Sequence, residues 1–451
     1  MRAVNPLWTG MLLAMTFSPI QAMTLSEAIQ STIDNHPEIS AGVNRRLSSD
    51  EDVKIAKGGY LPTVDALVGY GRENTDSPST RIIGDHNKET LTYSNTELRL
   101  RQMLFDGFNT PNEVARTQAV VNSRAYYVRG TSESLALRTA EVYLDVLKRR
   151  EMVALAKNNL LAHQRINDQI SLRSQQGVGS TADLDQSSAR LALAENNLYT
   201  EQVNLADAEA NFFSAVGRYP DELSAPASVK GEVPADLPTA RQVMMADNPF
   251  LKSAQADVNA AEKQYESAKA PFYPRVDAEL ATTADDNIQG DAGHYNTWRA
   301  GVVMNYNLFN GMRDKARLES SSHQINESMD IRNNALRLIN ENTALAWNAM
   351  ENARLQTPKA RDYAEYTASV REAYQQQFTL GQRTLLDLLD SENELFTANR
   401  RYTDVRYTEE YSMYRVLAAT GQLLRQQQVV LPAESVALSE VKSEAHLPAL
   451  Q

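Results

Sequence analysis

Two carboxylates and a guanidinium stand close together near residue 385, in a run that is otherwise rich in leucine. Asp387 and Asp390 are three residues apart, and Arg383 precedes the first of them by four. Residues three or four apart share one face of a helix, so the two carboxylates would lie one above the other. Grouped carboxylates attract and bind cations and can tune passage through a pore. The alternative is a hydrated helix face, since exposed charges are usually only solvated.

The remaining titratable residues form no catalytic or metal-binding pattern. The chain has no cysteine, which excludes disulfides, thiol catalysis and cysteine-based metal sites. Its histidines are scattered without the spacing of metal ligands: His36, His86, His163, His294, His323 and His446. We therefore predict a protein that is not an enzyme and uses no metal and no cofactor. The net charge of -12 includes no basic cluster, so nucleic acid is not an expected partner.

The first residues have the order of a secretory signal peptide. A single positive charge at Arg2 precedes an apolar run over residues 7–17, and Ile20-Gln21-Ala22 follows with a small residue at its end. We expect a signal peptide over residues 1–22 with cleavage after Ala22. The alternative, an N-terminal membrane anchor, would need a longer apolar run. No cysteine is available at the cleavage site for the lipid attachment that bacterial lipoproteins carry.

The second half of the chain repeats landmarks of the first half in the same order. Residues 56–66 return as residues 268–278, and the Leu-Phe-Asp-Gly run at 104–107 returns as Leu-Phe-Asn-Gly at 308–311. Further along, Gly179 and Asp185 match Gly381 and Asp387 at an interval of 202. Several matches in one order indicate a tandem duplication.

Each half is predicted to contain a helix, two strands around a polar loop, a very long helix, a tight turn and a further helix. Alternating apolar residues indicate the strands, and the near absence of proline and glycine between residues 112 and 176 indicates the first long helix. The expected first repeat covers 23–217, with one helix over 25–57, strands over 62–72 and 93–105, and helices over 110–176 and 181–216. A linker over 218–238 leads to the second repeat over 239–424, with a first helix, strands over 274–283 and 295–309, and helices over 312–380 and 382–423. A tail covers 425–451.

Leucines in the helix after the first turn recur every seven residues, at positions 184, 191, 198 and 205, and Phe212 follows at the same spacing. A weaker version in the second half uses Leu388, Leu395 and Tyr402. Heptad spacing is typical of a coiled coil. An ordinary helical-bundle core would show the same pattern, and the spacing alone does not decide between them.

Four strands of about ten residues each have the length needed to cross a bilayer at a tilt, but four strands cannot close a barrel. Several chains must therefore share one barrel, and three chains would supply about twelve strands. The predicted fold class is a mixed α and β membrane protein: an internally duplicated chain with a shared antiparallel outer-membrane β-barrel, four strands per protomer, and a long periplasmic α-helical coiled-coil tunnel.

This plan resembles the TolC-like outer-membrane channel-tunnel family over about residues 23–430. The resemblance includes the Leu-Ser-Glu-Ala-Ile run at 25–29, the two Ala-Lys-x-x-x-x-Pro segments, the Leu-Phe-Asp/Asn-Gly runs and the glycine-to-aspartate spacing at both turns. The family implies a homotrimer that forms a passive conduit from the periplasm to the outside. It also implies a periplasmic adaptor protein and an inner-membrane transporter as partners.

The same resemblance implies roles for residues at the two turns. Asp387 and Asp390 match aspartates that line a constricted entrance, and Arg383 matches an arginine that links to an aspartate, here Asp185. The family member compared has a tyrosine where this chain has Phe378, whose phenyl ring cannot donate a hydrogen bond. The turn residues implied to meet the adaptor are Val178, Gly179, Ser180, Leu380, Gly381 and Gln382. Glycine at a tight turn also has a sufficient structural reason.

Residues 141–147, 181–186 and 189–192 are more similar to the branch of the family that serves type I protein secretion. That branch implies an inner-membrane ABC transporter and an unfolded protein cargo of the large toxin, enzyme or adhesin class, with outer-membrane lipid around the barrel. The alternative function is the outer-membrane component of a multidrug efflux pump. A third interpretation, a periplasmic coiled-coil scaffold, explains the helices but not the alternating strands.

Overall fold

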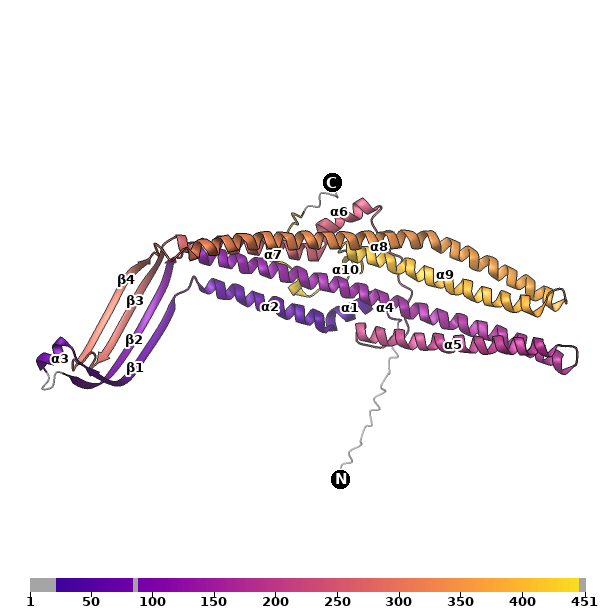
Figure 1. Ribbon diagram of the computed structural model, residues 1–451, viewed down its shortest axis with the longest axis horizontal. Coiled ribbons are helices and arrows are strands. Elements are labelled where there is room, and N and C mark those ends of the chain that lie inside the picture. The colour runs from indigo at the N-terminus through magenta and orange to yellow at the C-terminus, as the bar shows by residue number, and fades with distance from the viewer. Residues whose placement is uncertain (1–21, 84–87, 446–451) are drawn as a thin grey trace, which may run out of the picture.

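The computed structural model describes residues 22–83 and 88–445, and it has two distinct ends (Figure 1). A four-stranded sheet forms one end, and two pairs of long helices extend to the other. The signal peptide expected over residues 1–22 lies outside the described residues except for Ala22, as do residues 446–451 of the expected tail. Among the described helices, none is both long enough and apolar enough to cross a bilayer.

The sheet is antiparallel throughout and follows the order of the chain. It consists of β1 (Thr63–Thr75), β2 (Glu89–Phe105), β3 (Arg275–Asp286) and β4 (His294–Asn305), in the order β1-β2-β3-β4. The pairing of β2 with β3 joins the two halves of the chain. β1 and β4 are therefore the two edge strands of the sheet.

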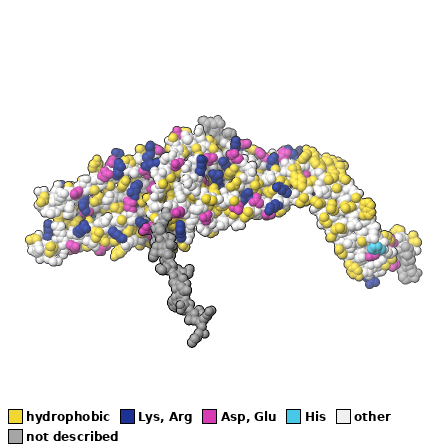
Figure 2. All heavy atoms as spheres, turned by 180° about the vertical axis from the view of Figure 1, so that it is seen from behind, with side chains coloured by type: hydrophobic (Ala, Val, Ile, Leu, Met, Phe, Trp, Pro, Cys, Tyr) yellow, Lys and Arg dark blue, Asp and Glu magenta, His cyan; other side chains and the backbone are white. Residues whose placement is uncertain are grey.

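One face of the sheet is apolar and the other is polar. On the apolar face Val64 pairs with Leu100, and Leu100 pairs with Leu280. This face is open: Val68 is 75% exposed and Trp298 is 74% exposed. Apolar side chains accordingly gather over the sheet in Figure 2, whereas charged side chains are spread along the helices. An exposed apolar area of this kind marks a surface that contacts lipid or another protein.

The opposite face carries charged side chains that pair across the strands. Asp65 lies opposite Arg99, and the Nε of Arg101 is 3.0 Å from the Oε1 of Glu279. Such cross-strand ion pairs contribute modestly to stability. Residue types that alternate with period 2 along each strand therefore give the sheet two chemically different faces.

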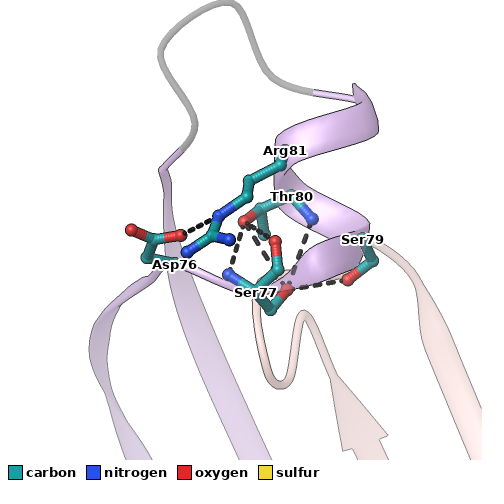
Figure 3. Close-up of polar contacts among 5 residues, drawn as sticks. All are labelled: Asp76, Ser77, Ser79, Thr80 and Arg81. Carbon is teal, nitrogen blue, oxygen red and sulfur yellow. Dashed lines mark hydrogen bonds and ion pairs between the residues drawn. The ribbon is translucent and has the colours of Figure 1, made fainter.

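The connection between β1 and β2 contains a short helix that the sequence did not predict. This helix, α3 (Pro78–Ile83), is capped by Ser77 and Thr80, whose side chains each accept a hydrogen bond from the other's backbone N–H at 3.3 and 2.9 Å respectively (Figure 3). The Nε of Arg81 is 2.7 Å from the Oδ1 of Asp76. Ser77 follows the end of β1, so these contacts order part of what the composition indicated as a polar loop.

The long helices continue from the strands. α4 (Asn109–Gln175) follows β2, and α8 (Arg313–Thr379) follows β4; each has 67 residues, which corresponds to about 100 Å. Pro358 lies inside α8 without ending it. After tight turns, α5 (Thr181–Val216) runs back along α4, and α9 (Leu385–Ala419) runs back along α8. We refer to α4 with α5 as hairpin 1 and to α8 with α9 as hairpin 2.

The single helix expected over residues 25–57 is wrong, because two helices occupy this segment. α1 (Leu25–Asn35) ends before His36, and α2 (Pro37–Gly58) starts at the proline. His36 is extended, with φ -73° and ψ 127°, because a residue before proline is sterically disfavoured in the helical region. The second half shows the same break at Asn248, between α6 (Leu237–Asp247) and α7 (Pro249–Ser267).

The main core lies in the middle of the molecule, where each break packs against the end of a shorter helix from the same half. Thr32 Oγ1 donates to the carbonyl of Ala215 at 3.2 Å, and Asn248 Nδ2 donates to the carbonyl of Ala419 at 3.0 Å. The largest fully buried side chains here include Tyr143, Phe212, Tyr414 and Leu417. This core fixes where the two hairpins leave the body of the protein.

The segment after α9 is ordered against the body of the protein. It contains α10 (Leu423–Gln426) and the short 3-10 helix η2 (Ala433–Ser435). Beyond η2, the backbone N–H of Leu438 donates to Asn122 Oδ1 at 2.7 Å, and that of Val441 donates to the hydroxyl of Tyr126 at 3.2 Å. Both acceptors lie on α4, so this segment follows the strand-proximal half of that helix.

Candidate functional site

The ends of the two hairpins far from the sheet contain the entrance and turn residues that the sequence analysis assigned by family resemblance. Each turn is closed by a glycine in the left-handed region, Gly177 and Gly381, both with φ +75°. In each turn the residue after the glycine donates its backbone N–H back into the helix, Val178 to Arg173 at 3.1 Å and Gln382 to Gln377 at 2.8 Å. This arrangement terminates a helix and satisfies its last carbonyls.

The interval of 202 that paired Gly179 with Gly381 and Asp185 with Asp387 is wrong. The two turns correspond at an interval of 204, since this interval separates the N-cap residues Ser180 and Thr384 and also the two glycines with φ +75°. The counterpart of Gly381 is therefore Gly177, and the counterpart of Asp387 is Asp183, the third residue of its helix. Gly179 is needed for a different reason, because a Cβ there would lie 2.9 Å from the backbone nitrogen of Ser174.

The six turn residues predicted to meet an adaptor lie at the hairpin ends, and two of them are apolar and open. Val178 is 75% exposed and Leu380 is 71% exposed. Ser180 caps α5 by accepting a hydrogen bond from the backbone N–H of Ala182 at 3.1 Å. Gly179, Gly381 and Gln382 complete the set of turn residues.

Asp387 has a structural partner within its own helix. Its backbone N–H donates to Thr384 Oγ1 at 3.2 Å, and its Oδ2 accepts from the backbone N–H of Thr384 at 3.3 Å, which forms a capping box. The Thr384 hydroxyl also donates to Asp387 Oδ2, at 2.8 Å. These hydrogen bonds hold the pKa of Asp387 below its usual range. The carboxylate is therefore charged at neutral pH and fixed at the start of α9.

Arg383 makes its contacts within hairpin 2. Its Nε donates to Gln377 Oε1 at 2.9 Å, its guanidinium lies 4.3 Å from the ring centroid of Tyr374, and its Nη1 is 4.0 Å from Asp387 Oδ2. Asp185 is exposed on α5. Within the described residues of one chain no ion pair joins Arg383 to Asp185, so the pair implied by the family resemblance is not an intrachain contact.

Asp390 is one of the residues that join the two hairpins. Its Oδ1 is 2.9 Å from the Nη2 of Arg190 on α5. The sequence placed Asp390 beside Asp387 but did not identify Arg190, because the partner lies 200 residues away and its approach depends on how the hairpins pack. The structure therefore brings the two aspartates to the same helix face but gives each its own arginine neighbour.

Phe378 lies in an apolar cluster, only 6% exposed, and not at an open position. We name this set the hairpin-end cluster; its members are Ile166 and Ile170 of α4, Leu184 of α5, Phe378 of α8 and Leu385, Leu388 and Leu389 of α9. The guanidinium of Arg173 lies 5.3 Å from the centre of the Phe378 ring. All four hairpin helices thus meet in apolar contact near the turns.

Above the hairpin-end cluster, buried carboxylates contact arginines from neighbouring helices. Glu201 of α5 is 2% exposed, and its carboxylate is 2.8 Å from Arg400 of α9 and 3.7 Å from Arg149 of α4. Sequence reasoning missed this site. A signal was available, since Ser187, Ala194, Glu201 and Ala208 are buried at heptad spacing next to the leucine series. A charge in such a seam indicates a partner on the facing helix.

Metal-binding groups are absent from residues 22–83 and 88–445, in which no set of three histidine, aspartate or glutamate residues could hold an ion. His163 is 4% exposed beneath Arg190, and burial together with that positive charge lowers its pKa. The chemistry available at the hairpin ends is therefore that of charged and apolar surfaces.

The model of the outer membrane efflux protein family matches residues 28–218 and 240–422, and the chain belongs to this family. The class expected from the sequence resemblance is confirmed. The protein is accordingly an outer-membrane channel-type protein, and its location is the outer membrane.

Individual relatives differ in what they transport. The chain is 26% identical to the outer membrane efflux protein BepC of Brucella suis, over 95% of this chain and 90% of BepC. It is 24% identical to the alkaline protease secretion protein AprF of Pseudomonas aeruginosa, over 86% of this chain and 82% of AprF. The solved structure of the Campylobacter jejuni CmeC outer membrane channel has the same fold, with a TM-score of 0.78 at 14% identity, over 91% of this chain and 90% of that one.

Proposed function

We propose that the protein is the outer-membrane exit duct of a tripartite type I secretion system. In this role it passes an unfolded protein of the large toxin, enzyme or adhesin class from an ABC transporter and a periplasmic adaptor to the outside. The observation that carries the proposal is a sheet with one exposed apolar face and one charged face that continues directly into two 67-residue helices. Such a chain can contact lipid at one end and reach far from the membrane at the other.

The duct would be a homotrimer. β1 and β4 are both edge strands, and an unpaired edge is a template for pairing with another chain. Three copies would join β4 of one to β1 of the next and close a barrel of about twelve strands. The apolar face would then contact lipid, and the charged face would line the interior.

The hairpin ends would form the periplasmic entrance, with Asp387 and Asp390 around it and the six turn residues meeting the adaptor. We place the Arg383 pair with Asp185 between neighbouring copies, since each side chain is exposed within its own chain. Arg383→Ser should then raise single-channel conductance in lipid bilayers, because one contact that holds the entrance closed is lost. Arg383→Lys is the matched control and should change conductance less. Unchanged conductance in Arg383→Ser would place the closing contact elsewhere.

Two relatives support different cargo. AprF is named for the secretion of a protease, which favours a protein cargo. BepC is named an efflux protein, which favours the second candidate, the outer-membrane component of a multidrug efflux pump. The periplasmic scaffold is not retained, since the chain belongs to an outer-membrane family.

Deletion of the gene tests the proposal against its alternative. The deletion strain should lose one or a few proteins from the culture medium, with little change in the inhibitory concentrations of drugs, and the wild-type gene should restore them. Complementation with a gene that encodes a variant with a disrupted hairpin turn is the matched control, and it should not restore secretion. Increased drug sensitivity with an unchanged set of secreted proteins would instead support the efflux component.

A further inference from the structure

Arg190 occupies a position that faces both hairpins. It lies on α5, and its Nη2 is 2.9 Å from the Oδ1 of Asp390 on α9, with the two side chains 31% and 57% exposed. A paired arginine and carboxylate have no net charge, so the field beyond the pair is that of a dipole. We infer that Arg190 neutralises Asp390 and thereby sets the charge, and hence the ion selectivity, of the entrance.

The segment that carries Arg190 is fixed on α4. Asn167 of α4 accepts hydrogen bonds from the hydroxyls of Ser187 at 2.7 Å and Ser188 at 3.1 Å, both on the turn of α5 just before Arg190. His163 of α4 is buried below Arg190 and its lowered pKa favours the uncharged imidazole. The guanidinium pairs with the carboxylate of Asp390, and it has no second carboxylate partner among the ion pairs of the described residues.

The second carboxylate of the entrance is compensated less closely. Asp387 is 4.0 Å from Arg383, whereas Asp390 is 2.9 Å from Arg190. The two aspartates are therefore not equivalent, and Asp390 adds little net charge while Arg190 is present. This inference rests on the proposed function, because an entrance exists only when several copies surround it.

The inference predicts opposite shifts for the two partners. Arg190→Gln should free the charge of Asp390, move the reversal potential in a salt gradient toward cation selectivity, and lower the blocking concentration of La³⁺ by about fivefold. Asp390→Asn should leave Arg190 uncompensated and shift both measurements the other way. In Arg190→Gln with Asp390→Asn the shifts should cancel and restore the wild-type values.

Two further variants separate charge from shape. Arg190→Lys keeps the positive charge and should remain close to wild type, and Arg354→Gln removes an arginine that pairs with Glu351 of its own helix at 2.9 Å, away from the hairpin ends. Exposed ion pairs contribute little to stability, so each variant should assemble. Oligomeric mass in detergent checks this before the conductance measurement.

Three results would each overturn the inference while wild-type channels still conduct: unchanged selectivity in Arg190→Gln, an equal shift in Arg354→Gln, or a double variant that keeps the shift of one single variant. A failure of the proposed function looks different. If the duct itself is wrong, the wild-type protein forms no channels in the bilayer, and the role assigned to Arg190 is overturned with it. If only the protein cargo is wrong, gene deletion supports the efflux component and the role of Arg190 stands.

Discussion

At the scale of single residues, Phe378 holds the hairpin ends together through apolar contact. Its side chain is 6% exposed and belongs to the hairpin-end cluster, whose members come from all four helices. Burial of a phenyl ring contributes a few kcal/mol, roughly as much as several exposed hydrogen bonds. Phe378 therefore contributes to the hairpin ends through packing and not through a side-chain hydrogen bond.

Phe378→Ala should open the hairpin ends. Truncation of a buried phenylalanine typically costs about 3–5 kcal/mol, so the thermal midpoint should fall and single-channel conductance should rise. Phe378→Leu keeps most of the apolar volume and serves as the control, with a clearly smaller effect on both. Wild-type conductance in Phe378→Ala would show that the cluster does not contribute to closure.

Glu133 is a buried carboxyl group at the other end of the hairpins, where α4 contacts α10. It is 3% exposed, and the backbone N–H of Leu424 donates to its Oε2 at 3.4 Å. Burial raises the pKa of Glu133 to about 8, against which the nearby Arg129 and backbone hydrogen bonds act only in part. The group is therefore largely protonated in the folded protein at neutral pH.

The stability of the protein should fall with rising pH because of Glu133. Between about pH 4.5 and 8 the unfolded carboxyl is ionised and the folded one is protonated, so folding loses roughly 1.4 kcal/mol per pH unit in this window. The loss is complete above the folded pKa. Glu133→Gln removes the titration, and its thermal midpoint should change less between pH 5 and pH 9 than that of the wild type. Parallel curves for both proteins would contradict this assignment.

At the scale of elements, local sequence patterns predicted the positions of the two turns but not the residues that correspond between them. Gly381 was correctly expected at a sharp reversal, but its partner was assigned two residues too late, because Gly179 looks equivalent by residue type and differs in conformation. The break at His36 was also missed, although Pro37 was visible in the sequence. Proline is acceptable in the first turn of a helix, and the residues on both sides of Pro37 have a helical pattern, so the sequence alone did not indicate a break.

Alanine substitutions at the three turn glycines should differ in their effect on protease sensitivity, because two introduce backbone strain and the third introduces a steric clash. Gly177→Ala and Gly381→Ala place a Cβ in open space and are strained only by φ +75°, which costs about 1–2 kcal/mol. Gly179→Ala is free of that strain but would press its Cβ against the backbone of Ser174, which cannot move away as a side chain can. Protease sensitivity at the turns, compared with the wild type, measures each effect. Equal sensitivity in all three variants would contradict the distinction.

At the scale of the whole molecule, the sequence predicted the order of elements because strand and helix periodicities are local. It also placed Asp387 and Asp390 on one helix face. It could not predict the contacts between hairpins, such as Arg400 with Glu201, since these depend on the rotation of each helix about its axis. The tandem duplication stays our proposal, supported by the interval of 204 between the N-caps of α5 and α9.

The sheet of a single chain is incomplete as a barrel. One chain leaves the outer edges of β1 and β4 unpaired and exposes the apolar side chains of Val68 and Trp298. These features are costly for an isolated protomer and would be removed if copies closed a barrel in lipid. The proposed duct therefore requires an oligomer.

The most direct measurement is the mass of the detergent-solubilised mature protein, determined by light scattering with correction for bound detergent, together with its circular dichroism. The account predicts a single species of three chains with the β signal of the sheet, which separates into chains only when that signal is lost. A monodisperse monomer that retains the full β signal would contradict the shared barrel, and with it the proposed exit duct.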